Sequence, residues 1–217
     1  MGRASLSLAS FVSCDTDAAR QTSTGHSRNR YVSAGENVSE MKCRNNRFMC
    51  IKENEIVLKP LLDKNISVFN RWLDKEYIYK WLCPSGEEYR TAWLDEVNNR
   101  NNKYSYMKHF IVNCNDKEIG FCLYMDCYFE REYTPKHYGI TVNKEKSVYE
   151  IGYFIGEEEY LNKGIGKIIV KKLEEKIIEI GGKEILADPD EENVISIKTL
   201  LSNGFMKIKN GAYRKRI

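Results

Sequence analysis

Two glycines stand just before a run of apolar residues with helical spacing, in the segment Leu161-Asn162-Lys163-Gly164-Ile165-Gly166. Glycine adopts backbone conformations that other residues avoid, so the chain can turn tightly here and leave the first N–H groups of a helix uncovered. Those N–H groups have no partner within the helix and lie at the positive end of its dipole. The sequence therefore predicts an anion site, suited to phosphate, at the start of a helix that runs from Gly166 to about Ile180.

Two common phosphate-binding motifs fit this segment poorly. A Walker loop requires Ser or Thr after its Gly-Lys pair, but Ile168 follows Gly166-Lys167. A dinucleotide-binding loop requires a third glycine, and Ile169 stands in its place. Both motifs are therefore disfavoured, and the ligand must be a phosphate compound of another kind.

The elements that position the glycine segment alternate only in part between strands and helices. Their order predicts an α/β fold with a mixed, mostly antiparallel sheet of about seven strands and a parallel pair around the 166–180 helix. Between them, 131–146 is polar and irregular, long enough to be a functional excursion. The expected strands are 55–61, 108–113, 118–129, 148–155, 183–187, 205–209 and 212–217, the last two joined by an Asn210-Gly211 turn, and the expected helices are 65–82 (broken near Asp74), 87–100, 166–180 and 191–202.

Composition narrows the class of protein. The chain has 217 residues with 42% hydrophobic and 30% charged residues, as in globular proteins, and its net charge of +3 gives no reason to expect a nucleic-acid partner. No apolar run approaches the roughly 18 residues of a membrane span. The seven cysteines form no C-x-x-C pair and the three histidines are scattered, so neither a metal site nor a disulfide framework is predicted. We expect a cytoplasmic protein with reduced cysteines, either a monomer or a homodimer.

Residues 1–41 differ in composition from the rest of the chain. All 22 lysines lie at Lys42 or later, and the first 41 residues are rich in Ser, Ala, Thr and Arg without a periodic apolar pattern. This break predicts a disordered leader: an added segment, a true start at Met41 or Met49, or a targeting peptide. Residues 55–217 are predicted to form a single domain.

The part of the chain around the glycine segment resembles the GNAT superfamily of N-acetyltransferases. Residues 148–205 are similar to its core, and the glycine segment matches its pyrophosphate loop, [RQ]-x-x-G-x-G, apart from Leu161 at the first position. Asn193, ahead of Gly204-Phe205, fits a later N-x-x-A…G-F segment. Fainter similarity to aminoglycoside 6′-N-acetyltransferases lies in Leu73-Asp74-Lys75, Trp81, Glu118–Phe121 and Asp188-Pro189.

The resemblance implies a three-layer fold with helices on both faces of the sheet, and acetyl-CoA as co-substrate. Backbone N–H groups of the glycine segment would bind the pyrophosphate, and two lysines there either add charge or are ordinary solvated residues. The 148–155 and 183–187 strands would part at their ends, and the pantetheine would pair with backbone in the gap. The implied cofactor-binding residues are Phe154, Ile155, Asn162, Lys163, Gly164, Ile165, Gly166, Lys167 and Asn193.

Transfer of an acetyl group to an amine needs a base and, for the departing thiolate, an acid. The implied candidates for the base are Glu150 and Asp188, one on each parting strand; the alternatives are a solvent-facing strand residue for Glu150 and a helix cap or turn for Asp188. Leu200 stands where many family members carry the tyrosine that protonates the thiolate. Tyr153 or Tyr160 would have to serve instead, or the thiolate leaves unaided.

The acceptor pocket is expected from 65–100 and 131–146, which hold acids among aromatic residues and would suit a cationic amine. Glu157 to Glu159 are expected to form a solvated turn. The leading hypothesis is an acetyl-CoA-dependent N-acetyltransferase acting on a primary amine of a small molecule, with aminoglycosides first, and without nucleic-acid or membrane partners. The alternatives are a protein or peptide N-acetyltransferase and a non-catalytic acyl-CoA-binding module.

Overall fold

The computed structural model describes residues 51–208 and 211–217. The predicted leader, residues 1–41, lies outside this part of the chain. The described residues form a seven-stranded sheet in the order β1-β2-β3-β4-β5-β7-β6. Its strands are β1 (Ile56–Pro60), β2 (Met107–Cys114), β3 (Lys117–Asp126), β4 (Val148–Ile155), β5 (Glu184–Ala187), β6 (Met206–Lys207) and β7 (Tyr213–Arg216).

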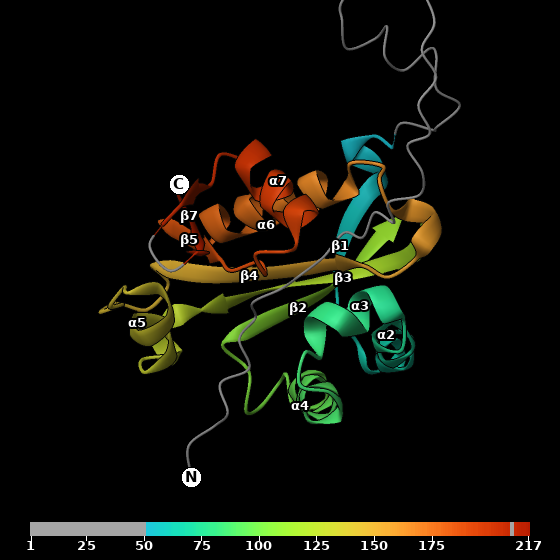
Figure 1. Ribbon diagram of the computed structural model, residues 1–217, viewed down its shortest axis with the longest axis horizontal. Coiled ribbons are helices and arrows are strands. Elements are labelled where there is room, and N and C mark those ends of the chain that lie inside the picture. Colours follow the sequence, from blue (N-terminus) through green and yellow to red (C-terminus); the bar gives the residue numbers. More distant parts are fainter. Residues whose placement is uncertain (1–50, 209–210) are drawn as a thin grey trace, which may run out of the picture.

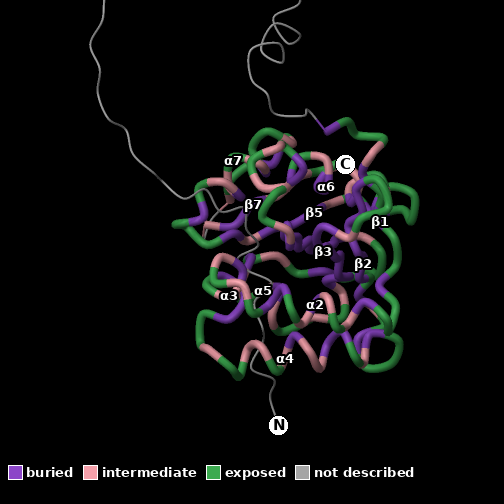
Figure 2. Tube along the Cα trace, turned by 90° about the vertical axis from the view of Figure 1, so that its right-hand side faces the viewer, coloured by how far each residue is buried: buried purple, intermediate pink, exposed green. Residues whose placement is uncertain are grey.

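Helices cover both faces of the sheet (Figure 1). On one face lie α6 and α7, and on the other lie α2 to α5, so the predicted three-layer arrangement is confirmed. Buried residues gather along the strands, while exposed residues lie on the outer sides of the helices (Figure 2). The helices are α2 (Ile66–Leu73), α3 (Glu76–Leu82), α4 (Glu87–Asn98), α5 (Tyr133–Tyr138), α6 (Ile165–Glu179) and α7 (Val194–Ser202), and short 3-10 helices span Glu53–Glu55, Asp63–Asn65, Cys127–Phe129 and Glu158–Tyr160.

The sheet is mixed, as predicted. The β4–β5 pair is parallel, and the other neighbouring strands are antiparallel. The crossover between β4 and β5 contains α6, as parallel strands require. The predicted hairpins formed by β2 and β3 and by β6 and β7 are both present, although Asn210 of the second turn lies outside the described residues.

Several boundaries differ from the prediction for local reasons. The 65–82 helix is interrupted at Asp74 as expected, but β3 ends at Asp126 and a 3-10 helix replaces its predicted end. The prediction that 131–146 is irregular was wrong for Tyr133–Tyr138, which form α5, a helix that stops at Gly139 (φ 67°). The last helix begins at Val194 rather than near 191, because the Asn193 side chain caps it.

β4 runs through the centre of the molecule and is buried along its whole length. Side chains alternate between the two faces of a strand. The core beneath α2 and α4 therefore contains Phe154, whereas the core beneath α6 contains Tyr149, Ile151, Tyr153 and Ile155. Glu150 lies an even number of residues before Phe154 on the same strand, so its side chain points to the same face as that of Phe154, away from α6. This alternation places Glu150 on the face of β4 opposite the glycine segment.

Gly156, the residue after β4, packs directly beneath Trp72 of α2. A Cβ atom at this position would lie 2.4 Å from the indole ring, which is itself fully buried. We predict that Gly156→Ala lowers the free energy of unfolding in urea by about 1–3 kcal/mol, the usual cost of overpacking a core. Gly166→Ala is the matched control, because its Cβ would lie 3.4 Å from the nearest atom, an ordinary contact. Equal stability of the two variants would contradict this packing.

Candidate active site

The glycine segment borders an open hollow of about 410 Å³ between the start of α6 and α7. Gly164 is in the left-handed conformation (φ 73°) and occupies the N-cap position of α6, and Asn162 also has a positive φ (61°). The tight turn predicted from the glycines is therefore present, and it leads directly into the first turn of α6. The residues lining this hollow, here called the phosphate hollow, are Ile155, Asn162, Gly164, Ile165, Gly166, Lys167, Ile195, Lys198, Thr199 and Ser202.

Three predicted cofactor residues lie elsewhere. The Lys163 ammonium is 5.4 Å from the Tyr160 ring centroid and does not line the phosphate hollow. The Phe154 side chain packs against Phe121 in the opposite core, so that only its backbone can face the gap beside β4. Asn193 accepts a hydrogen bond from the Ser196 N–H (3.2 Å), which fixes the start of α7.

Lys198 of α7 was missed by sequence reasoning. It lies near the glycine segment only because α7 packs beside α6, and it brings a second lysine to the phosphate hollow next to Lys167. The spacing of Ile195, Lys198, Thr199 and Ser202 places them on one face of α7. That spacing is the sequence signal that would have identified Lys198.

β4 and β5 separate soon after they pair. Val148 to Glu150 pair with Glu184 to Leu186, yet β4 continues to Ile155 and β5 ends at Ala187. The predicted parting of these strands is therefore confirmed, and a narrow crevice of about 10 Å³ opens between them. The crevice is lined by Ile151, Tyr153, Ala187, Asp188, Pro189, Ser196 and Leu200.

Glu150 is fully buried at the point where the strands part. Neither of its carboxyl oxygens makes a hydrogen bond of ordinary geometry to a described residue, and the same holds for the buried Tyr138 hydroxyl nearby. Burial raises the pKa of Glu150 well above its ordinary value; the Tyr138 hydroxyl opposes this change and the charge of Asp188 adds to it. Glu150 is therefore not the solvent-facing strand residue that was its alternative interpretation, and its surroundings favour the protonated form.

Asp188 lies directly after β5 and has a different environment. Its carboxylate contacts Nε2 of His137, and the side chains of Asp188 and His137 are 13% and 33% exposed. The His137 ring stacks on Tyr133, with ring centroids 4.9 Å apart. Asp188 caps no helix, since Asn193 caps α7. Sequence reasoning did not single out His137, whose only signal was its place in the 131–146 excursion.

Leu200, which stands where many family members carry the tyrosine, is buried and lines the crevice. The Tyr153 hydroxyl lies 3.3 Å from Ser196 Oγ, and burial raises the pKa of Tyr153 to about 12. Tyr153 thus keeps its proton at neutral pH and can offer it in a hydrogen bond within the crevice. Tyr160 packs at the edge of the core beneath α6, outside the crevice.

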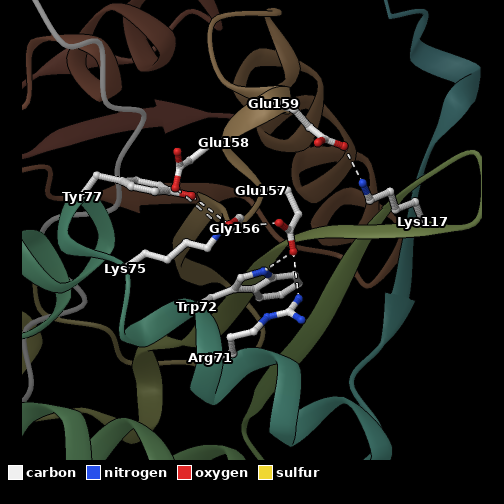
Figure 3. A network of polar contacts seen from close by, with 9 residues as sticks. All are labelled: Arg71, Trp72, Lys75, Tyr77, Lys117, Gly156, Glu157, Glu158 and Glu159. Carbon is white, nitrogen blue, oxygen red and sulfur yellow. Dashed lines mark hydrogen bonds and ion pairs between the residues drawn. The ribbon is translucent and has the colours of Figure 1, made fainter.

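The three acids after β4 are paired with cations (Figure 3). The Glu157 carboxylate accepts hydrogen bonds from Arg71 (2.9 Å), Trp72 Nε1 (2.9 Å) and Lys75 (3.3 Å). The predicted solvated turn is therefore wrong for Glu157, whose side chain is 20% exposed. Lys75 also approaches Glu158 and Lys117 pairs with Glu159, so nearby cations offset acidic charge close to the predicted anion site.

The pKa of Glu157 is shifted in the opposite direction to that of Glu150. Burial alone would raise its pKa, but the Trp72 hydrogen bond together with the charges of Lys75 and Arg71 outweighs burial and lowers it. The carboxylate of Glu157 is therefore held in its ionised form. This group links α2 to the turn between β4 and α6.

Comparison with known families decides the identity of the fold. The model of the Acetyltransferase (GNAT) family matches residues 71–205, more than half of the chain. The chain belongs to this acetyltransferase family. Its membership confirms the resemblance seen in the sequence, and it makes the protein an acyltransferase.

Solved structures share the fold of this acetyltransferase. AAC(6')-Ib in complex with ribostamycin and coenzyme A is 18% identical, with a TM-score of 0.57 over 75% of this chain and 93% of that one. An aminoglycoside N(6')acetyltransferase from Legionella pneumophila is 14% identical, with a TM-score of 0.57 over 75% and 91%. An uncharacterized protein from Bacillus halodurans is 14% identical, with a TM-score of 0.59 over 74% and 83%. At these identities the similarity shows the fold alone.

Residues 51–208 and 211–217 contain no helix with the length and apolar character needed to cross a membrane. The same residues contain no group of three or more His, Cys, Asp or Glu side chains placed to hold a metal ion.

The two acids with opposite pKa changes give a paired prediction. The pKa of Glu150 is higher in the folded than in the unfolded chain, so this carboxyl destabilises the fold increasingly as the pH rises above the ordinary range of Glu. Glu150→Gln should raise the free energy of unfolding by about 2 kcal/mol at pH 7 and have little effect near about pH 4.

Glu157→Gln is the matched comparison, for which the expected change in the free energy of unfolding has the opposite sign. The lowered pKa of Glu157 contributes stability above its unfolded pKa that is lost as the pH falls through the folded value, so this variant should be less stable at pH 7. Urea unfolding from pH 4 to 8 measures both variants. Curves for Glu150→Gln that parallel those of the unsubstituted protein at every pH would disprove the assignment of a costly buried carboxyl.

Proposed function

We propose that this acetyltransferase transfers the acetyl group of acetyl-CoA to a primary amine of a small cationic molecule, with aminoglycosides as the first candidates. The observation that carries the proposal is that α7 borders both spaces. Lys198 and Thr199 of α7 line the phosphate hollow, whereas Ser196 and Leu200 of the same helix line the crevice together with Asp188. An anion site and a carboxylate thus border the same helix.

The phosphate hollow fits the pyrophosphate of CoA. The N–H groups of Ile165, Gly166 and Lys167 form the first turn of a 15-residue helix, so they have no helical carbonyl to bind. Lys167 and Lys198 add positive charge at the same place. A Cβ atom at Gly166 would lie 3.4 Å from Tyr153 and 3.6 Å from Thr199, so a longer side chain at this position would crowd the space between α6 and α7.

The gap between the strands fits the pantetheine arm and the thioester. Beyond Glu150, β4 no longer pairs with β5, so one side of its backbone can exchange hydrogen bonds with the amide groups of the arm. Ile155 stands at the end of the phosphate hollow, whereas Ile151 and Tyr153 line the crevice. When bound, acetyl-CoA supplies the activated acetyl group, and a backbone N–H of β4 would polarise its carbonyl.

Glu150 points to the face of the sheet away from α6, where the acceptor would bind, and Asp188 lines the crevice and contacts His137 of α5. An acceptor amine is mostly an ammonium at neutral pH and must lose a proton before it can attack. Asp188 is placed at the gap to take that proton. Glu150 lies beneath the gap as a buried acid without a hydrogen-bond partner among the described residues, a group to which an ammonium could donate.

A small acceptor is favoured over a peptide by the surroundings of the carboxylates. Glu150 is fully buried and Asp188 is mostly covered by α5, so an acceptor must reach them through a confined space. AAC(6')-Ib, a protein of the same fold, has been solved with ribostamycin, an observation about that protein which gives aminoglycosides their first place here. Acetylation of a protein amine is the second candidate function, and the leucine at Leu200 keeps a non-catalytic acyl-CoA-binding module as the third.

A thiol-release assay distinguishes these functions. The protein is incubated with acetyl-CoA and ribostamycin, kanamycin, a lysine-containing peptide or no acceptor, and the products are weighed by mass spectrometry. We predict that CoA thiol is released with an aminoglycoside and that the acceptor gains one acetyl group. Turnover with the peptide alone would assign the second function, and CoA binding without turnover of any amine would assign the third.

Substitution of Gly166 tests the phosphate hollow separately from catalysis. Gly166→Asn adds a side chain of nearly the same size as Gly166→Asp but without charge, so the pair separates crowding from electrostatic repulsion. We predict that both variants weaken CoA binding, measured by calorimetry, and that the aspartate weakens it about tenfold more, because an anion at a helix N-terminus would repel the pyrophosphate. Unchanged CoA affinity in both variants would remove the phosphate hollow from the proposal.

A further inference from the structure

Two neighbouring residues of α5 face the two candidate carboxylates. His137 contacts the Asp188 carboxylate at the end of β5. Tyr138 is buried, and its hydroxyl influences the ionisation of Glu150 on β4. The short helix that sequence reasoning missed is therefore in contact with both parting strands, in the layer away from the phosphate hollow.

Asp188 connects His137 to the gap. It lies two residues beyond Leu186, the last β5 residue that pairs with β4, and it lines the crevice between the strands. The same carboxylate is in contact with the imidazole of His137. A proton delivered to Asp188 at the gap therefore has a titratable group beside it.

The exposure of these groups sets a direction for the proton. Glu150 is fully buried, so its carboxyl has no exposed side through which a proton could pass to solvent. The side chain of Asp188 is 13% exposed and that of His137 is 33% exposed. The exposed fraction of the side chain thus increases from Glu150 to Asp188 and from Asp188 to His137, in the direction of the solvent.

We propose that His137 is a positioning residue of the transfer reaction: it holds the Asp188 carboxylate at the gap and receives from it the proton that the acceptor ammonium loses. This inference rests on the proposed N-acetylation. The N–H bond of the ammonium breaks, and its proton passes to Asp188, then to the imidazole and then to water. As the nitrogen forms its bond to the acetyl carbon, the C–S bond breaks and its electron pair leaves with sulfur. The second proton of the amine ends on the CoA sulfur, so that one proton is released overall.

The key variant is His137→Gln, because glutamine can still donate an N–H to Asp188 but cannot carry a proton at neutral pH. We predict that it lowers kcat for the amine about 10- to 100-fold and changes the KM for acetyl-CoA and the affinity for CoA less than about twofold, because the phosphate hollow is untouched. Lys136→Gln is the matched control, an exposed position one residue earlier on α5. A merely structural His137 would be replaced by the glutamine without loss of kcat.

Double substitutions test whether His137 acts through Asp188. Residues that act as a unit show non-additive effects, so His137→Gln combined with Asp188→Asn should be no slower than the slower of the two single variants. Combined with Glu150→Gln, in contrast, its effect should multiply. Should His137→Gln prove unstable, His137→Asn carries the same test, with CoA affinity as the check on folding.

Three results would overturn the inference. A kcat for His137→Gln within about twofold of that for Lys136→Gln excludes the proton role, and so does a multiplicative effect with Asp188→Asn. Both leave the proposed N-acetylation intact, because the unsubstituted protein still turns over. Failure of the unsubstituted protein to acetylate any amine while it binds CoA overturns the proposed function itself, and the inference with it.

Discussion

The separation of β4 from β5 is the constraint on which the rest of the site depends. β4 is the central strand, buried on both faces, and it loses its β5 partner after Glu150 while its pairing with β3 continues to Ile155. A buried backbone that lacks a partner strand needs hydrogen bonds from elsewhere, and the proposed pantetheine arm would supply them. The alternation of β4 turns Glu150 to the face opposite the phosphate hollow, and Asp188 lines the crevice where the strands part.

The two faces are joined by one buried contact at the end of β4. Trp72 of α2 packs on Gly156 so closely that no side chain fits between them, and its indole N–H binds Glu157. The Tyr77 hydroxyl of α3 donates to the Gly156 carbonyl (2.8 Å). The helices on the acceptor side and the turn that leads to the glycine segment thus share a single junction. The cations at this junction also offset the negative charge of the acidic turn, so that the turn is compatible with an anion site nearby.

Features encoded by local sequence were predicted well. The glycine pair, the break at Asp74 and the parallel β4–β5 pair follow from spacing and turn residues over short stretches, and the family assignment followed from the same segment. Features that depend on contacts between distant segments were missed. The contact between His137 and Asp188 joins residues 51 positions apart, and that between Arg71 and Glu157 spans 86. α5 was missed because a short helix that contains Pro135 has almost no periodic signal.

A crystal structure of the protein with CoA bound would test the central claim most directly, because the claim concerns where the ligand lies. The account predicts pyrophosphate oxygens within hydrogen-bond distance of the N–H groups of Ile165 to Lys167, a pantetheine arm paired with β4 beyond Glu150, and the sulfur at the crevice beside Asp188. CoA bound elsewhere, or a gap between β4 and β5 that stays closed around it, would contradict the account.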